Sequence, residues 1–284
     1  MTRKRKPIHS IVLYLLLIGF SAVFMVPMIW MLSTSAKSLK QVYSTKPQFF
    51  DWPIYIRENY NYVIQSYHFF SYFGNTLKVA VIATFGRVLS SAMAGYAFAR
   101  IDFPGRKVLF AIALCTMMIP SQVTQIPTYI IYSRIHWLDS YLPMTVPSYF
   151  GNVFSIFLMR QFFLSVPQEI EDAAKIDGCG SWRIFTRIMI PLAKAGIITI
   201  TLFAFLDNWD DFQGALLYLD TPRKYTLSLF LNMFKSQAGI DKINYLMAAS
   251  VMTVAPKFVM YFFSQKQFMN SLSIAYSMKK GILK

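Results

Sequence analysis

Residues 165–178 read SVPQEIEDAAKIDG, and they lie between two long apolar segments. Ser165 followed three residues later by Gln168 is a capping-box pattern, and Pro167 suits a first helical turn. Gly178 stands where a helix would end, because glycine readily adopts the positive φ of a C-terminal cap. The stretch therefore predicts a short helix of about three turns that connects two membrane segments.

The predicted helix carries a face of small residues. Ile170, Ala173, Ala174 and Asp177 recur at helical spacing. Because two alanines form the centre of this face, the surface of another protein could approach it closely. An ordinary connector is the alternative, but joining two helices does not require so long and so well capped a segment.

The composition around this stretch indicates a membrane protein. Hydrophobic residues make up 55% of the 284 residues and charged residues only 14%, whereas soluble domains average about 25% charged residues. A bilayer core requires about 20 mostly apolar residues per helix. Segments that meet this requirement are residues 11–32, 72–97, 108–131, 142–163, 188–206 and 245–263. The predicted fold class is therefore an all-α integral membrane protein with six transmembrane helices.

The distribution of charge predicts the topology. A net charge of +15 would also suit a nucleic-acid binder, but the basic residues lie mainly between apolar segments, which the positive-inside rule explains better. With the N-terminus inside, most of them, including the run from Arg3 to Lys6, fall on the cytoplasmic side. Both termini and residues 165–191 are therefore predicted to be cytoplasmic. The first apolar stretch is too long for a signal peptide and lacks an obvious cleavage site, so we expect a retained anchor.

Two predicted outer loops are long, residues 33–70 and 207–244, and loops of this length usually have structure or a partner. The predicted organisation has three parts. Residues 1–71 form the basic N-terminal segment, the first helix and an outer loop. Residues 72–264 form the transmembrane core, which contains loop 165–191, and residues 265–284 form a cytoplasmic tail.

Loop 165–191 resembles the EAA loop of the permease subunits of binding-protein-dependent ABC importers. That motif reads EAA, three residues, Gly, nine residues and I-x-L-P. Here Asp172-Ala173-Ala174 takes the EAA place, Gly178 follows at the right distance, and Ile188-Met189-Ile190-Pro191 closes the pattern. Asp172 stands where Glu is usual and Ile190 where Leu is usual. The shorter Asp172 would reach one methylene less far into a partner.

The resemblance implies the fold of type I ABC importer permeases and gives the loop a role. Its helix would sit in a cleft of a cytoplasmic ATPase and transmit the closure of that ATPase. The residues implied in this coupling are Glu171, Asp172, Ala173, Ala174, Asp177, Gly178 and Pro191. The chain has no Gly-rich phosphate loop of its own. ATP and Mg would therefore be bound by the ATPase, with no cofactor in this chain and no enzyme activity of its own.

The resemblance also implies partners and a location. The partners would be a second, homologous permease subunit in a heterodimer, two ATPase subunits and an extracytoplasmic solute-binding protein. The complex would lie in the cytoplasmic membrane of a prokaryote, in contact with lipid and not with nucleic acid.

Further stretches resemble carbohydrate importers, and in particular the six-helix permease subunit of the maltose importer. They cover most of residues 72–264 and include residues 75–77, 94–100, 103–106, 118–120, 138–139 and 208–212. The implied solute is a sugar or oligosaccharide, and another solute class is the alternative. The tail matches less well, because residues 268–281 lack most of the glycines of that branch. A tail that contacts the ATPase and a basic terminus attracted to anionic lipid both remain open.

Two groups of polar residues are candidates for the solute pathway or for contact with the binding protein. Asn208, Trp209, Asp210 and Asp211 combine hydrogen-bonding groups with an aromatic ring at the outer end of the fifth segment, and Gln122 and Gln125 lie with Ser121 and Thr124 in the third. Polar residues inside a membrane are costly and often functional. The alternatives are helix–helix hydrogen bonding in the third segment and a water-facing cap in the fifth.

Other residue patterns argue against different classes of protein. His9, His68 and His136 are scattered, with no metal-ligand spacing and no catalytic arrangement of carboxylates. A secondary transporter would call for inverted repeats and buried coupling charges, and neither is evident. Arg87 lies toward the inner end of the second segment, where its side chain is expected to reach the lipid headgroups.

Overall fold

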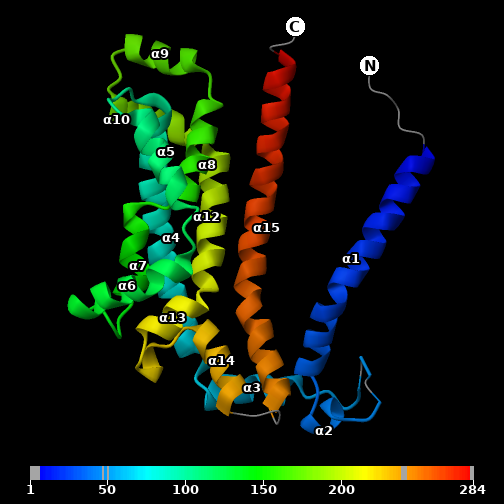
Figure 1. Cartoon of the computed structure of the whole chain (residues 1–284). Helices are drawn as coiled ribbons and strands as arrows, with labels where there is room; N and C mark the ends of the chain where they lie inside the picture. The colour runs from blue at the N-terminus through cyan, green and yellow to red at the C-terminus, as the bar shows by residue number, and fades with distance from the viewer. Residues whose placement is uncertain (1–6, 47, 50, 238–241, 282–284) are drawn as a thin grey trace. The chain divides into compact units, whose positions relative to one another are not determined.

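A computed structural model describes residues 7–46, 48–49, 51–237 and 242–281, which form helices joined by turns and loops (Figure 1). Helices long and apolar enough to cross a membrane are Ile11–Ser35, Phe69–Arg100, Leu142–Leu164 and Ile243–Gln265. Two bent pairs of helices each qualify as one further span: Arg106–Thr116 with Ser121–Arg134, and Ser181–Leu192 with Lys194–Trp209. Each of the six predicted segments therefore has a counterpart, and four of them are unbroken helices by this measure.

The third and fifth segments are bent, which differs from the continuous helices predicted over 108–131 and 188–206. Helices α5 (Arg106–Thr116) and α6 (Ser121–Arg134) meet at 96°, and Pro120 is the residue before α6. The fifth segment bends by 78° after Leu192. A proline has no N–H to donate and clashes with the preceding turn, so Pro120 and Pro191 each stand where a helix starts anew.

The chain divides into two compact units. The first comprises Met1–Phe70 with Leu231–Ala255, and the second comprises Ser71–Phe230 with Pro256–Lys284. In the first unit, the long outer loop predicted over 33–70 contains α2 (Leu39–Val42) and α3 (Ile56–Ser66) after α1 (Pro7–Ser35). The Asn59 amide ties the end of α1 to α3, because it donates to the backbone oxygens of Ser35 and Lys37 at 2.8 Å each.

The second unit is built on α4 (Phe69–Arg100) and α8 (Val153–Leu164), which pack closely. A Cβ added at Gly95 of α4 would lie 2.7 Å from the Cβ of Met159 on α8, so only glycine permits this approach. The apolar core at this end also takes residues from the loop after α8. Its fully buried members are Ala92, Tyr96, Ala99, Met159, Phe163, Val166, Ala174, Ile184, Phe185, Met189, Ala193 and Ile200.

The remaining elements of the second unit follow the same chain order. They are α7 (Leu142–Thr145), η1 (Val146–Phe150), α9 (Gln168–Ile176), α10 (Ser181–Ile184), η2 (Phe185–Met189), α11 (Ile190–Leu192), α12 (Lys194–Trp209), α13 (Phe212–Tyr218) and η3 (Pro222–Lys224). Helices α9 and α10 lie at one end of this unit, which we call the inner end, and α13 lies toward the other, the outer end (Figure 1).

Helices α14 (Leu227–Gln237) and α15 (Ile243–Gly281) each run from one unit into the other. Within the second unit, α15 runs antiparallel to α12, because Lys257 pairs with Asp210 and Ser264 lies near Thr199. The predicted tail of residues 265–284 continues α15 as helix to Gly281. The side chains of residues 266–284, and with them the predicted contact of the tail, lie outside the described part.

Candidate functional site

The loop at the inner end contains the predicted short helix, with a different start. Helix α9 begins at Gln168 after Pro167, and no side chain caps its first turn. The predicted capping box is wrong, because the Ser165 hydroxyl donates back to the Phe162 oxygen at 2.7 Å and so completes α8 instead. The predicted end is confirmed: Gly178 has φ 77°, in the left-handed region that favours glycine.

One side of α9 is buried within this chain. Glu171 and Ala174 are only 4% and 6% exposed. The Tyr96 hydroxyl donates to Glu171 Oε1 at 3.2 Å, and Arg100 Nε lies 3.6 Å from Glu171 Oε2. Tyr96 and Arg100 are one helical turn apart on α4, so both reach the same carboxylate. Glu171 therefore joins α9 to α4.

Arg100 also holds the end of α8. Its Nη2 donates to the Phe163 oxygen at 2.7 Å and to the Val166 oxygen. The side chains of Arg100 and Glu171 are 7% and 5% exposed, so the pair is shielded from water. Removing one partner of such a pair leaves a buried charge and costs about 3–5 kcal/mol. The inner ends of α4, α8 and α9 are thereby fixed together.

The opposite side of α9 is open. Asp172, Ala173, Asp177 and Gly178 are exposed, and Ile176 is 87% exposed. Of the four residues predicted to share one accessible face, Ala174 instead packs into the core, because the helix turns it toward Tyr96 and Phe163. The accessible face consists of Ile170, Asp172, Ala173, Ile176, Asp177 and Gly178, which we call the coupling face.

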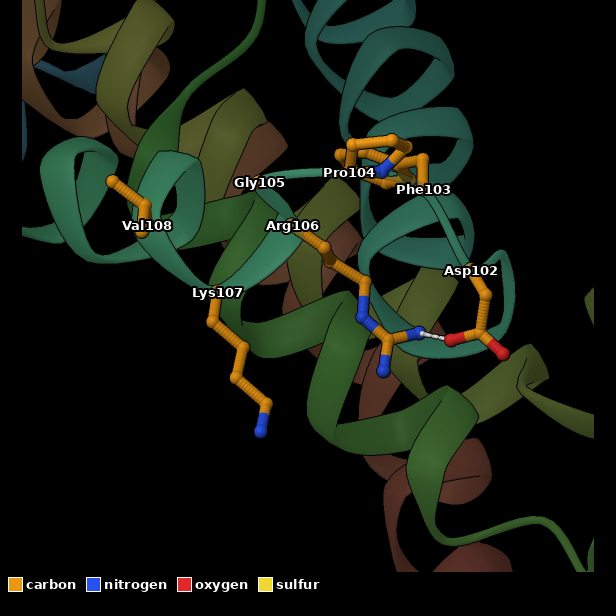
Figure 2. A pocket seen from close by; sticks show the side chains of 7 residues that line it. All are labelled: Asp102, Phe103, Pro104, Gly105, Arg106, Lys107 and Val108. Carbon is orange, nitrogen blue, oxygen red and sulfur yellow. Dashed lines mark ion pairs between the residues drawn. The ribbon is translucent and has the colours of Figure 1, made fainter.

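Two other features belong to this inner end. Pro191 is exposed within α11, after a π-helical turn, so it shapes the path of the chain into α12 and makes no part of the coupling face. A hollow of about 600 Å³ is lined by seven consecutive residues, 102–108, at the turn from α4 to α5. Figure 2 shows the Asp102–Arg106 ion pair, 2.8 Å long, and the Lys107 side chain pointing away from it. The hollow is open turn surface, because its walls come from one short stretch of chain.

Toward the outer end, a polar pocket of about 250 Å³ lies between α6 and α13. Its walls are formed by Ser121, Thr124, Gln125, Thr128, Asp211, Gln213, Gly214, Leu217 and Tyr218. The structure thus brings Gln125 of one predicted group together with Asp211 of the other. Hydroxyl, amide and carboxylate groups beside a tyrosine ring can hydrogen-bond and stack on a polyhydroxylated molecule.

Asp211 has a structural partner within this pocket. Its Oδ1 accepts the backbone N–H of Gly214 at 2.8 Å and so caps α13. Burial raises the pKa of Asp211, and the N–H of Gly214 opposes that rise. The predicted alternative of a cap is therefore correct for Asp211, although the same side chain also lines the pocket.

The other predicted pathway residues lie elsewhere. Trp209 is 1% exposed and stacks on Phe205 with ring centres 5.3 Å apart, so it belongs to the core. Asn208 donates to the Ala204 oxygen at 2.6 Å, and Asp210 pairs with Lys257 of α15 at 2.6 Å. Gln122 is exposed on α6 beside Ser121, outside the walls of the pocket.

Sequence reasoning missed an ion pair and misplaced one of its members. Arg87 does not reach toward headgroups: it is 8% exposed, and its Nη1 lies 2.7 Å from Asp207 Oδ2. The pairing follows from burial, because a cation inside a helix bundle needs an anion at hand. A charged residue in each of two apolar segments was the signal that could have found the pair. Tyr96 and Arg100 at the end of α4 gave a similar signal for the anchor of α9.

Comparisons with known proteins give the chain a family. The family described as "Binding-protein-dependent transport system inner membrane component" matches residues 86–271. A probable ABC transporter permease protein of Pyrococcus horikoshii is 35% identical over 72% of this chain and 74% of that protein. A diacetylchitobiose uptake system permease protein of Streptomyces coelicolor is 32% identical over 91% of this chain and 85% of that protein.

A solved structure has the same fold. It is a crystal structure of a bacterial ABC transporter involved in the import of the acidic polysaccharide alginate. One of its chains superposes with a TM-score of 0.81 and 25% identity, over 94% of this chain and 99% of that one.

Proposed function

Because this chain belongs to the family of binding-protein-dependent transport system inner membrane components, we propose that it forms half of the translocation pathway of an ATP-driven importer of sugars or oligosaccharides. Members of this family are multi-pass transport components and not enzymes, and the ATPase of the transporter resides in separate subunits. The observation that carries the proposal is the coupling face: an exposed strip of α9 on a helix that is otherwise fixed to the bundle by Glu171 and Arg100.

The coupling face has the properties that a moving partner requires. Ala173 and Gly178 let another backbone approach, and Asp172 can accept hydrogen bonds. Glu171 and Ala174 contribute differently, because they hold α9 against α4 and α8. Pro191 and Gly178 fix where the loop turns. A push on the coupling face would thus reach α4 and α8 directly, without flexing of the loop.

The partners and cofactors of the proposed importer follow from its architecture. Two ATPase subunits bind ATP and Mg, and this chain binds neither. A second, homologous permease completes the pathway as a heterodimer, and a solute-binding protein delivers the solute from outside. The complex resides in the cell membrane of a prokaryote, with both termini of this chain in the cytoplasm.

The assignment to carbohydrates rests on the relatives and on the outer pocket. The named relatives take up diacetylchitobiose or import alginate. The pocket between α6 and α13 offers Gln125, Thr124, Ser121 and Asp211 as hydrogen-bonding groups, with the Tyr218 ring alongside. The solute passes this pocket on its way inward, while Asn208, Trp209 and Asp210 hold α12 and α15 in place around it.

The mechanical part of the proposal is tested at Gly178. Gly178→Trp places a bulky side chain on the coupling face and strains the backbone, because φ there is 77°. We expect the ATPase to dissociate or to hydrolyse ATP without transport, while the chain stays in the membrane. Gly180→Trp is the control, since Gly180 has φ −69°. Transport that persisted in membranes lacking any ATPase would overturn the proposal.

The solute class is tested separately. The assembled importer with its binding protein is screened for ATPase stimulation by neutral oligosaccharides, acidic oligosaccharides, amino acids and peptides. Stimulation by an oligosaccharide supports the assignment. Stimulation by another class alone would keep the importer and change its cargo.

A further inference from the structure

The ion pair between Arg87 and Asp207 lies at a depth where a bilayer is hydrocarbon. Arg87 is thirteen residues before Arg100, and Asp207 is thirteen residues after Lys194. At about 1.5 Å per residue, each is about 20 Å from the inner end of its helix. The hydrocarbon layer is about 30 Å thick. Both charges therefore lie well inside it.

The two partners differ sharply in exposure. The Arg87 side chain is 10% exposed, and its Nε donates to Ser155 Oγ at 2.8 Å while its Nη1 binds Asp207 Oδ2 at 2.7 Å. The Asp207 side chain is 64% exposed. Within the described residues, its Oδ1 accepts no hydrogen bond. The cation is thus embedded in the chain, and the carboxylate projects outward from it.

A lipid environment does not suit this carboxylate. An aspartate at the centre of a membrane helix costs about 3 kcal/mol, and such side chains face a bundle interior or a water-filled cavity. Arg87 already balances the charge, so the site calls for hydrogen-bond donors and not for a second cation. Phe203 lies one turn nearer the inner end on the same face of α12 and is 41% exposed.

We propose that Asp207, positioned by Arg87, lines the solute pathway and binds hydroxyl groups of uncharged, polyhydroxylated solutes, with Phe203 as the stacking surface beside it. This inference rests on the proposed function and adds a site about one helical turn inward of the outer pocket. A carboxylate accepts strongly from hydroxyls, and it repels anionic groups. The site therefore disfavours acidic saccharides relative to neutral ones.

A thiol at position 203 tests both the water and the charge of the pathway without requiring the solute. The free thiols of Cys115 and Cys179 are first replaced by serine, and Phe203→Cys is introduced in the full importer in membranes. The rates of modification by a cationic and an anionic methanethiosulfonate are measured and divided by their rates with a small free thiol. The matched control adds Asp207→Asn with Arg87→Gln, which removes both charges and leaves neither buried alone.

We expect the Phe203→Cys thiol to react with the cationic reagent about tenfold faster than with the anionic one, and the preference to fall close to parity in the control. A thiol inert to both reagents, with and without ATP, would overturn the inference. So would a preference that survives removal of the charges. An importer that couples ATP hydrolysis to transport and yet shows either result leaves the proposed function standing. A chain that associates with no ATPase would overturn the proposed function, and this inference with it.

Discussion

Two carboxylates tie loops to the bundle at opposite ends of the second unit, and they do so by different means. At the inner end, Glu171 is nearly inaccessible and lies 3.6 Å from Arg100 Nε, beyond hydrogen-bond distance. At the outer end, the Asp139 side chain is 30% exposed and accepts from the Thr221 hydroxyl and the Lys224 ammonium at 2.7 Å each. The inner attachment depends on burial, and the outer one depends on hydrogen bonds that water can partly replace.

This difference suits the two ends to different tasks. A face that receives force from an ATPase needs a support that does not yield, and a pair shielded from water gives one because breaking it strands a charge. The outer knot holds the turn before α7 to the segment after α13, since the Asp139 backbone N–H also donates to the Tyr218 oxygen at 2.7 Å. A half-exposed knot can loosen at lower cost.

The largest expected effect comes from breaking the inner attachment. Glu171→Ala strands Arg100 and should destabilise the second unit by about 3 kcal/mol. Glu169→Ala, on the exposed side of the same helix, is the matched control and should change little. We expect a lower Tm for the purified importer and ATP hydrolysis without transport. An equal, small effect of both substitutions would show that burial of Glu171 carries no special weight.

Two neighbouring glycines sharpen the account of the coupling face. A Cβ at Gly178 or Gly180 would meet open space, but only Gly178 has a positive φ. Gly178→Ala should therefore cost about 1–2 kcal/mol and reduce transport per ATP hydrolysed, while Gly180→Ala should be near neutral. Equal losses of transport would mean that side-chain size, and not backbone conformation, matters in this turn.

The smallest expected effect comes from the outer knot. The ammonium of Lys224 and the donors of Thr221 hold the pKa of Asp139 well below its usual range. A carboxylate whose pKa is lower in the folded state stabilises the fold above its unfolded pKa of about 4 and loses that contribution as pH falls through the folded value. Asp139→Asn should thus cost below about 1 kcal/mol at neutral pH.

The pH dependence distinguishes this knot from a purely structural contact. The Tm difference between the wild type and Asp139→Asn should be constant from pH 7 to pH 5 and should shrink below about pH 4. A difference that stays constant down to pH 3 would contradict the role of the charged carboxylate.

The sequence predicted the class of fold well, because long apolar segments and basic inner loops are one-dimensional signals. The short helix and the glycine at its end were equally local: Gly178 needs only its own φ. Ser165 failed as a cap because its hydroxyl serves the helix before it, a choice that depends on where α8 ends in space.

The candidate sites were harder to predict because their geometry is set by packing between distant segments. Arg100 and Glu171 are 71 residues apart, and Arg87 and Asp207 are 120 apart. Trp209 has the chemistry of a sugar-binding ring, but α4 and α12 bury it. The two groups of polar residues, around Gln125 and around Asp211, did converge on one pocket, yet periodicity alone could not say which members would line it.

The central claim is that one side of α9 meets the ATPase and the other side anchors the helix. Ala173 and Ala174 are adjacent and equal in size, and only Ala174 is buried. With Cys115 and Cys179 replaced by serine, Ala173→Cys and Ala174→Cys are compared for cross-linking to cysteines introduced into the ATPase cleft of the assembled importer. Cross-linking through Ala173→Cys but not through Ala174→Cys is the predicted result. Cross-linking through Ala174→Cys alone, or through neither, would contradict it.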